Sequence, residues 1–284
     1  MCIRDSHRTA KFFIGGKQAR PDGGTVRPVW NKDGSLAGTV GQGNRKDLRN
    51  AVEAAQKASS WSKSSGHLRA QILFYFAENL SLRRQELETR LQQLLGCESN
   101  EAKQEVDSSI QRCFHYAALA DKFEGALHQP PQGMLVPVLN EPLGVIGLIS
   151  PDENPLLSFL SMLLPSLAVG NRSIVISSYS YPLIANDLIQ GIETSDIPAG
   201  VVNLISGNPT EMIETLAAHE DLDGIWVFGS QGEVSQAKRL STGNLKRVWS
   251  SEGQVVDWYS STAQGREWLQ QASQSKNIWI PFGE

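Results

Sequence analysis

The sequence predicts an α/β fold built around a doubly wound parallel sheet. From Leu143 onward, short apolar runs rich in valine and isoleucine alternate with helical stretches. Such alternation is typical of a parallel sheet covered by helices on both faces. Prolines near the expected helix starts and glycines near the expected helix ends agree with it. The five expected strands are 145–150, 174–177, 201–206, 225–228 and 247–250, and the four helices between them are 155–169, 182–194, 209–219 and 232–242.

The segment before this sheet predicts further strands and helices. Residues 12–16, Phe-Phe-Ile-Gly-Gly, predict a short strand and a turn. The close glycines from Gly38 to Gly43 predict a strand and a tight turn, because neither a GxGxxG order nor a following Lys-Ser/Thr supports a phosphate loop. Asn44, with Asp47 three residues later, predicts a capped helix start.

Two longer helices are expected over 68–95 and 100–120, because leucines and other apolar residues recur there at helical spacing. Cys113 lies on the apolar stripe of the second helix. We therefore interpret Cys113 as a small buried hydrophobic residue and not as a reactive thiol.

Composition and charge exclude several classes of function. The net charge is −4, the isoelectric point is near 5.8, and the basic residues are scattered, which argues against a nucleic-acid or anionic-membrane surface. The longest apolar run, 156–170, is too short and too interrupted to span a membrane. The five histidines lack metal-ligand spacing, so no metal site is expected.

The three cysteines, Cys2, Cys97 and Cys113, form no CxxC pair, and this sparse count favours a reducing cytoplasm. Residues 1–10 contain no apolar signal-peptide core. Residues Met1 to Ser6 match nothing in the pattern that follows. We interpret 1–10 as a non-native or disordered prefix, and we expect native residues upstream to be missing.

The chain from Lys11 resembles the aldehyde dehydrogenase superfamily. The resemblance rests on FFIGGK at the start, on EVDSSIQRCFHYA, on the long unit EPLGVIGLISPDENPLLSFLSMLLPSLAVGNRSIVI, and on IPAGVVNLISG and IWVFGS. It implies a Rossmann-like nucleotide-binding domain with N-terminal helices, an oligomerisation arm and NAD(P) as the cofactor. The residues at which it would place that cofactor are Ser150, Pro151, Ser177, Ser180, Gly207, Phe228, Gly229 and Ser230.

Several of these positions depart from the family pattern. Asp152 stands where the family has the asparagine of Pro-Trp-Asn-Phe-Pro, which helps to hold an oxyanion; a carboxylate there opposes a developing alkoxide. Asn154 is an alternative donor after a small backbone shift. Ser177 and Ser180 replace the charged Lys and Glu that grip the adenosine ribose, although two hydroxyls remain. Gly229 either faces a pyrophosphate or serves only a strand-to-helix turn.

The catalytic groups of the family are also missing. Ser250 stands where the family has a glutamate that activates water or the thiol, and Glu252 lies two positions away. After residue 257 only a short link leads to 275–281, which resembles the family's C-terminal oligomerisation strand. We infer that the catalytic domain with its cysteine nucleophile is deleted. Aldehyde oxidation by that route needs a thiolate, so no catalytic residue is assigned.

The expected organisation is a nucleotide-binding domain in two parts, 11–132 and 143–257, an oligomerisation strand at 133–142, and a linker helix with a C-terminal oligomerisation strand at 258–284. This pattern is most similar to the degenerate second domain of the two-domain (family 16) aldehyde dehydrogenases. It predicts a pseudo-domain that supports assembly, as a homo-oligomer or with an upstream catalytic domain.

Two alternatives remain. One is a cofactor-binding oxidoreductase module that works with a thiol-bearing domain elsewhere. The other is a hydrolase that uses Ser250 or Ser251, which lacks a triad partner.

Overall fold

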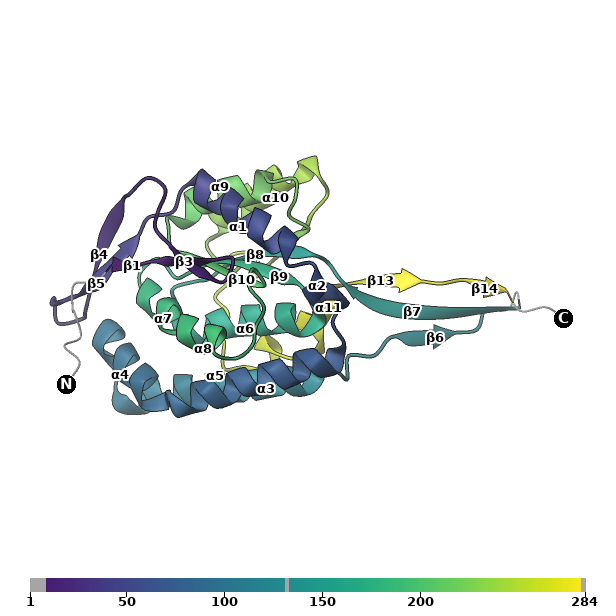
Figure 1. Ribbon diagram of the computed structural model, residues 1–284, viewed down its shortest axis with the longest axis horizontal. Helices are drawn as coiled ribbons and strands as arrows, with labels where there is room; N and C mark the ends of the chain where they lie inside the picture. The colour runs from purple at the N-terminus through teal and green to yellow at the C-terminus, as the bar shows by residue number, and fades with distance from the viewer. Residues whose placement is uncertain (1–8, 131–132, 282–284) are drawn as a thin grey trace.

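The computed structural model describes residues 9–130 and 133–281, and its core is a seven-stranded sheet (Figure 1). The expected parallel strands are all present and pair in the order β12-β11-β8-β9-β10. Their side chains are buried along β8 to β11, as in a sheet covered on both faces. Their bounds are β8 Val145–Ile149, β9 Arg172–Ile176, β10 Val202–Ile205, β11 Gly224–Val227 and β12 Arg247–Ser250.

The sheet is mixed, which corrects the expectation of a purely parallel one. Strands β2 (Phe12–Ile14) and β3 (Lys17–Ala19) extend it beyond β10, and both pairings are antiparallel. The strand and turn at 12–16 were predicted, but their place in this sheet was not. A short N-terminal hairpin can pair with an open sheet edge from any direction, so its own sequence does not fix that place.

Helices cover both faces of the sheet (Figure 1). One face carries α1 (Arg45–Lys57), α9 (Pro209–Ala218) and α10 (Gln231–Leu240). The other carries α6 (Pro155–Val169), followed by α7 (Pro182–Asp187) and α8 (Ile189–Glu193). The segment 182–194 is therefore two short helices that meet at Leu188 instead of one.

The apolar run at 156–170 forms α6, and every residue from Pro155 to Gly170 is buried. Within residues 9–130 and 133–281, no helix is both long and apolar enough to cross a membrane. The predicted cap at Asn44 is confirmed, since Asn44 and Asp47 form a reciprocal capping box at the start of α1.

The helix expected over 68–95 is interrupted, which corrects that expectation. It consists of α3 (Gly66–Leu82) and α4 (Arg84–Leu95), and the chain leaves helical geometry at Arg83. The Arg83 guanidinium donates to the Glu86 carboxylate and to the Asp187 carbonyl. These bonds hold the turn against α7, and apolar spacing alone does not reveal them because the stripe continues across the break.

Helix α5 (Ser99–Leu119) matches the expectation closely, and it packs against α3 and α6. Cys113 on this helix is fully buried, as predicted. Burial raises the pKa of the Cys113 thiol, because desolvation disfavours the thiolate. Cys113 is therefore a packing residue.

Two smaller sheets complete the fold. One contains β1 (Thr9–Ala10), β4 (Val26–Trp30) and β5 (Leu36–Gly41), so the close glycines do belong to a strand and its turn. The other is an arm that extends far from the body (Figure 1). The strands of the arm are β6 (Ala126–His128), β7 (Met134–Pro142), β13 (Ser273–Asn277) and β14 (Ile280–Pro281).

The remaining short elements are α2 (Ser60–Lys63), α11 (Arg266–Gln271) and the 3₁₀ turns Ser241–Gly243 and Ser261–Ala263. Gly243, expected at a helix end, lies in the first of these 3₁₀ turns. The prefix assigned to 1–10 lies outside the described residues except for Thr9 and Ala10, which form β1.

Candidate functional site

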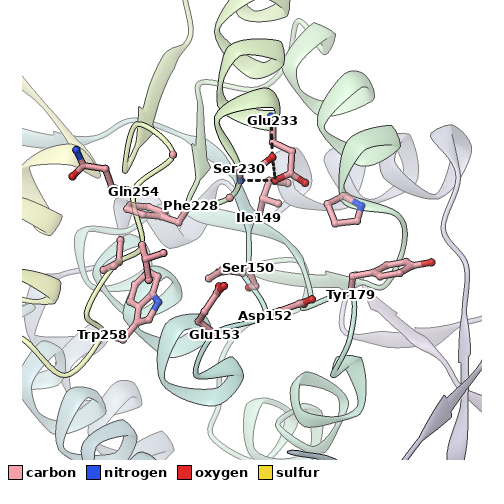
Figure 2. Close-up of a pocket in the computed structure, with 16 residues that line it drawn as sticks. Ile149, Ser150, Asp152, Glu153, Tyr179, Phe228, Ser230, Glu233, Gln254 and Trp258 are labelled. Atoms are coloured by element: carbon pink, nitrogen blue, oxygen red, sulfur yellow. Dashed lines mark hydrogen bonds between the residues drawn. The ribbon is translucent and has the colours of Figure 1, made fainter.

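A cavity of about 320 Å³ opens where the strand order of the sheet reverses. The chain runs from β8 outward to β9 and β10, then returns to place β11 on the other side of β8. In open α/β sheets ligands bind at this reversal, beyond the carboxyl ends of the strands. The cavity is lined by Ile149, Ser150, Pro151, Asp152, Glu153, Tyr179, Pro209, Phe228, Gly229, Ser230, Glu233, Gly253, Gln254, Val255, Val256 and Trp258 (Figure 2).

The Asp152 carboxylate binds hydroxyls that follow β9. Its Oδ1 accepts a hydrogen bond from Ser178 Oγ at 2.6 Å and another from the Ser180 backbone N–H at 3.1 Å. Its Oδ2 accepts from Ser180 Oγ. The Ser178 hydroxyl also accepts from the Tyr181 N–H, so the whole turn is held by one carboxylate. The Ser180 hydroxyl, expected to face a ribose, is therefore already donating to the chain's own Asp152.

A second carboxylate lies at the start of α10, beside β11. Glu233 Oε2 accepts from the Ser230 backbone N–H at 2.8 Å and from Ser230 Oγ at 2.9 Å (Figure 2). Glu233 and Ser230 thus form a capping box. The same oxygen lies only 2.3 Å from where a Cβ on Gly229 would stand. The space that Gly229 leaves open is therefore filled by the Glu233 carboxylate.

Asn154, the alternative oxyanion donor, is occupied as well. It adopts left-handed backbone geometry at φ 44°, and its side-chain N–H donates to the Tyr259 hydroxyl at 3.3 Å. The N–H groups of Leu156 and Leu157 at the start of α6 donate to the buried Glu105 carboxylate of α5. A carboxylate near these N–H groups is favoured by the helix dipole, so Glu105 holds the start of α6.

Ser250, at the position where the resemblance places a glutamate base, binds a neighbouring surface carboxylate. Ser250 Oγ donates to Glu252 Oε1 at 3.1 Å. Glu252 is exposed, has φ 53°, and forms an ion pair with Lys238 at 2.6 Å. Neither residue lines the cavity. Glu252 is thus a surface turn residue.

An aromatic cluster forms one wall of the cavity through Phe228 and Trp258. Trp258 lines it and lies edge-to-face with Phe228, with ring centroids 5.5 Å apart. Trp268 stacks on Phe228 at 5.3 Å and meets Trp249 at 4.5 Å. The buried Arg112 guanidinium donates to the backbone carbonyls of Trp258 and Ala263. The segment after β12 is therefore firmly packed against the sheet, where the family resemblance implied a catalytic domain.

The residues assigned to a cofactor from the sequence separate into two groups. Ser150, Pro151, Phe228, Gly229 and Ser230 all line the cavity, whereas Ser177, Ser180 and Gly207 are not among the residues that line it. The Ser177 hydroxyl is buried and lacks a hydrogen-bond partner among the described residues.

Sequence reasoning missed Glu233, Gln254 and Trp258 as lining residues. The S-x-x-E pattern at Ser230 could have revealed the role of Glu233. Among the residues that the structure describes, no cluster of three or more His, Cys, Asp or Glu is arranged to hold a metal ion.

Comparison with known proteins identifies the family. The model of the aldehyde dehydrogenase family matches residues 19–253. The chain belongs to the aldehyde dehydrogenase family. It is 30% identical over 247 residues to a betaine aldehyde dehydrogenase of Bacillus subtilis strain 168, a match that covers 84% of this chain and 49% of that protein. A malonate-semialdehyde dehydrogenase of Bacillus pumilus is also 30% identical, with 86% of this chain and 50% of that protein covered.

Solved structures of the family agree with the fold. A putative aldehyde dehydrogenase from Burkholderia cenocepacia aligns with a TM-score of 0.82 at 26% identity, over 86% of this chain and 50% of that one. PnpE in complex with nicotinamide adenine dinucleotide also aligns with a TM-score of 0.82 at 26% identity, over 84% and 50%. The chain thus spans about half the length of the relatives it matches.

The residues at the crevice do not fit a dinucleotide. A pyrophosphate at the start of α10 would lie beside the Glu233 carboxylate, which already accepts from the N-cap residue Ser230. At the other end, Asp152 occupies the Ser178 and Ser180 hydroxyls. The two negative charges of a dinucleotide's pyrophosphate would be repelled by the three carboxylates that line the cavity, those of Asp152, Glu153 and Glu233.

Proposed function

We propose that this chain is a catalytically degenerate pseudo-domain that supports assembly of a larger NAD(P)-dependent aldehyde dehydrogenase. The observation that carries the proposal is the Glu233 carboxylate, which completes the capping box of α10 at the helix start where the resemblance would place a pyrophosphate. Displacing this carboxylate to admit a ligand would break both of its hydrogen bonds to Ser230 before any contact with the ligand is made. At the other end of the crevice, Asp152 also opposes nucleotide binding, because it accepts hydrogen bonds from the Ser178 and Ser180 hydroxyls.

The cysteines support the proposal. The sequence contains only Cys2, Cys97 and Cys113, and neither Cys97 nor Cys113 lines the cavity. Burial and the nearby Glu105 raise the pKa of Cys97, which leaves less of the nucleophilic thiolate. Among the residues that the structure describes, thiohemiacetal formation therefore has no cysteine at the crevice. We also propose a reducing, cytoplasmic setting, which the free thiols of Cys97 and Cys113 favour.

The arm supports the assembly role. It presents two sheet edges, one along β6 and one along β13 and β14, with β7 between them. Exposed sheet edges readily pair with another chain, and this arm also exposes large apolar side chains. These are Leu127, Leu139, Ile278, Trp279 and Ile280. We propose a second copy of the chain, or a catalytic domain upstream of it, as the partner.

Nucleotide binding is tested by calorimetric titration of the full chain with NAD. We expect no binding at micromolar concentrations, because three carboxylates line the cavity. In an Asp152→Asn, Glu233→Gln double variant, affinity should rise roughly fivefold for each charge removed. Glu252→Gln is the matched control, since Glu252 is exposed and lies outside the cavity.

Micromolar affinity of the unaltered chain would instead support a cofactor-binding module that acts with a thiol-bearing domain elsewhere. The retained cavity at the strand-order reversal favours that second reading.

Assembly is tested by sedimentation of the full chain beside a chain that lacks residues 276–284. We expect a dimer or larger oligomer that dissociates on truncation while the body stays folded, because β14 and most of the exposed apolar residues of the arm are removed. Circular dichroism checks the fold of the truncated chain. A chain that is monomeric at every concentration, with or without the segment, would contradict an assembly role for the isolated arm.

A further inference from the structure

The cavity at the strand-order reversal combines negative charge with aromatic walls. Asp152, Glu153 and Glu233 all line it, and none of the described lysines or arginines does. The Glu153 side chain points into the cavity in Figure 2, and it is exposed. Asp152 and Glu233 hold hydroxyls through some of their oxygen lone pairs, but each carboxylate has room for further donors.

A buried hydroxyl at the same place lacks a partner. Ser150 follows β8, lines the cavity and is 4% exposed, yet its Oγ makes no hydrogen bond among the described residues. Buried polar side chains are nearly always hydrogen-bonded, so an orphaned hydroxyl in a cavity wall marks a place where a ligand or water donates or accepts. This observation is independent of the three carboxylates.

The rim of the cavity already holds one cation from the chain itself. The Arg27 guanidinium lies over the Tyr179 ring, 4.2 Å from its centroid, and also donates to the Tyr179 carbonyl. Tyr179 lines the cavity next to Asp152. A cation beside an aromatic face and a carboxylate is therefore an arrangement that this rim stabilises.

We propose that the cavity binds a small organic cation, with a primary ammonium group near Glu153 and Ser150 and an apolar portion against Phe228 and Trp258. A primary ammonium has three N–H donors and no acceptor, which matches carboxylates and a hydroxyl oxygen. The apolar lining from Ile149, Val255 and Val256 favours an organic cation over a hydrated metal ion. No described cluster is arranged to hold a metal.

This site goes beyond the proposed assembly role and does not depend on it. The same charges that oppose a dinucleotide would attract an ammonium ion, so a closed nucleotide site and an open cation site follow from one set of side chains. Of the three carboxylates, Arg27 interacts with Asp152, after Tyr179, which leaves Glu153 and Glu233 to attract the ligand.

The test is a titration of the full, isotope-labelled chain with n-butylammonium chloride, followed by backbone amide chemical shifts. Shifts should concentrate at Ser150, Gly229 and Gln254, and they should weaken as salt is raised, because exposed ion pairs are screened. 1-Butanol is the neutral control ligand, which has a similar shape and no charge. Calcium chloride is the inorganic control.

Variants locate the charge. Glu153→Gln should weaken n-butylammonium binding about two- to fivefold, the usual range for one exposed ion pair. Glu193→Gln, an exposed carboxylate in α8 that is not among the lining residues, should leave it unchanged. Ser150→Ala should also weaken binding, while thermal melting shows whether the variant is folded.

Three results would overturn the proposal. These are equal shifts with 1-butanol, equal shifts with calcium at the same amides, and an unchanged affinity in folded Glu153→Gln and Ser150→Ala chains. Binding of NAD to the unaltered chain would overturn the pseudo-domain proposal and leave this titration intact, so the two failures are distinguishable.

Discussion

The crevice and the arm differ in whether their exposed groups already have partners within the chain. In the crevice, the Ser180 hydroxyl and the Ser230 N–H bind the chain's own carboxylates. In the arm, sheet edges stay open and Trp279 is 60% exposed. In our proposal, the nucleotide site is thus closed by one or two side chains, whereas a surface for another chain is carried by whole strands. The contrast teaches that the two kinds of site can change independently in one fold.

Two tryptophans make the contrast concrete. Trp268 is buried among Phe228, Trp226 and Trp249, and its ring N–H donates to the Thr262 carbonyl at 3.0 Å. Trp279 lies between β13 and β14 and is mostly exposed. Trp268 therefore stabilises the body, whereas Trp279 offers a contact surface on the arm.

The largest effect is expected for Trp268→Ala. Removing a buried tryptophan typically lowers the free energy of unfolding by about 3–5 kcal/mol, through lost burial and the cavity that remains. Here the stacking on Phe228 and the link to Thr262 are lost as well. Urea denaturation followed by circular dichroism measures the change. A loss below about 1 kcal/mol would mean that the segment after β12 is not an integral part of the core.

An intermediate effect is expected at Glu105, which binds the start of α6. Glu105→Ala leaves the Leu156 and Leu157 N–H groups without their acceptor, which should cost about 1–3 kcal/mol. Glu105→Gln keeps an acceptor and removes the charge. Burial raises the Glu105 pKa above its ordinary value near 4.5, and the two backbone N–H bonds only partly oppose this.

The sign of the pH dependence follows from that direction. The folded state holds the Glu105 proton to a higher pH than the unfolded state, so stability is lost as pH rises from about 4.5 through the raised pKa. The glutamine variant cannot ionise, so its stability relative to the unaltered chain should increase as pH rises through this window. Urea midpoints of both chains at several pH values measure the difference in stability. The other titrating groups are the same in both chains, so their contributions cancel. A constant difference would contradict a buried, charge-bearing Glu105.

Much of the sheet and the crevice could be predicted from the sequence. Parallel strands such as β8 are continuous apolar runs, and prolines such as Pro155 mark helix starts, so local signals agree with the fold. Ser150 and Gly229 were placed at the crevice by the family resemblance. The departure at Asp152 was also visible as a misplaced charge.

The remainder depended on long-range contacts. The break at Arg83 depends on a carbonyl at Asp187, and the place of β2 depends on Leu204 in β10. The cap of α6 comes from Glu105, 51 residues away, so no local pattern announces it. Sequence patterns report neighbours in the chain, whereas these features join residues that only folding brings together.

The smallest effect on stability, and the sharpest test of the contrast, is expected for Trp279→Ala. Because Trp279 is mostly exposed, its removal should change the free energy of unfolding of the isolated chain by no more than about 0.5 kcal/mol. Association should be weakened far more, because large aromatic side chains contribute strongly to protein interfaces. At the best-packed positions, truncation to alanine costs about 2 kcal/mol or more of binding free energy. We therefore expect the dimer dissociation constant to rise about 30-fold. Sedimentation over a concentration series measures it, and Leu82→Ala, an exposed apolar residue at the end of α3, is the matched control outside the arm. An equal rise of the dissociation constant in both variants would indicate nonspecific hydrophobic association instead of an interface on the arm. A large loss of stability in Trp279→Ala would mean that Trp279 contributes to the folded body, contrary to its exposure.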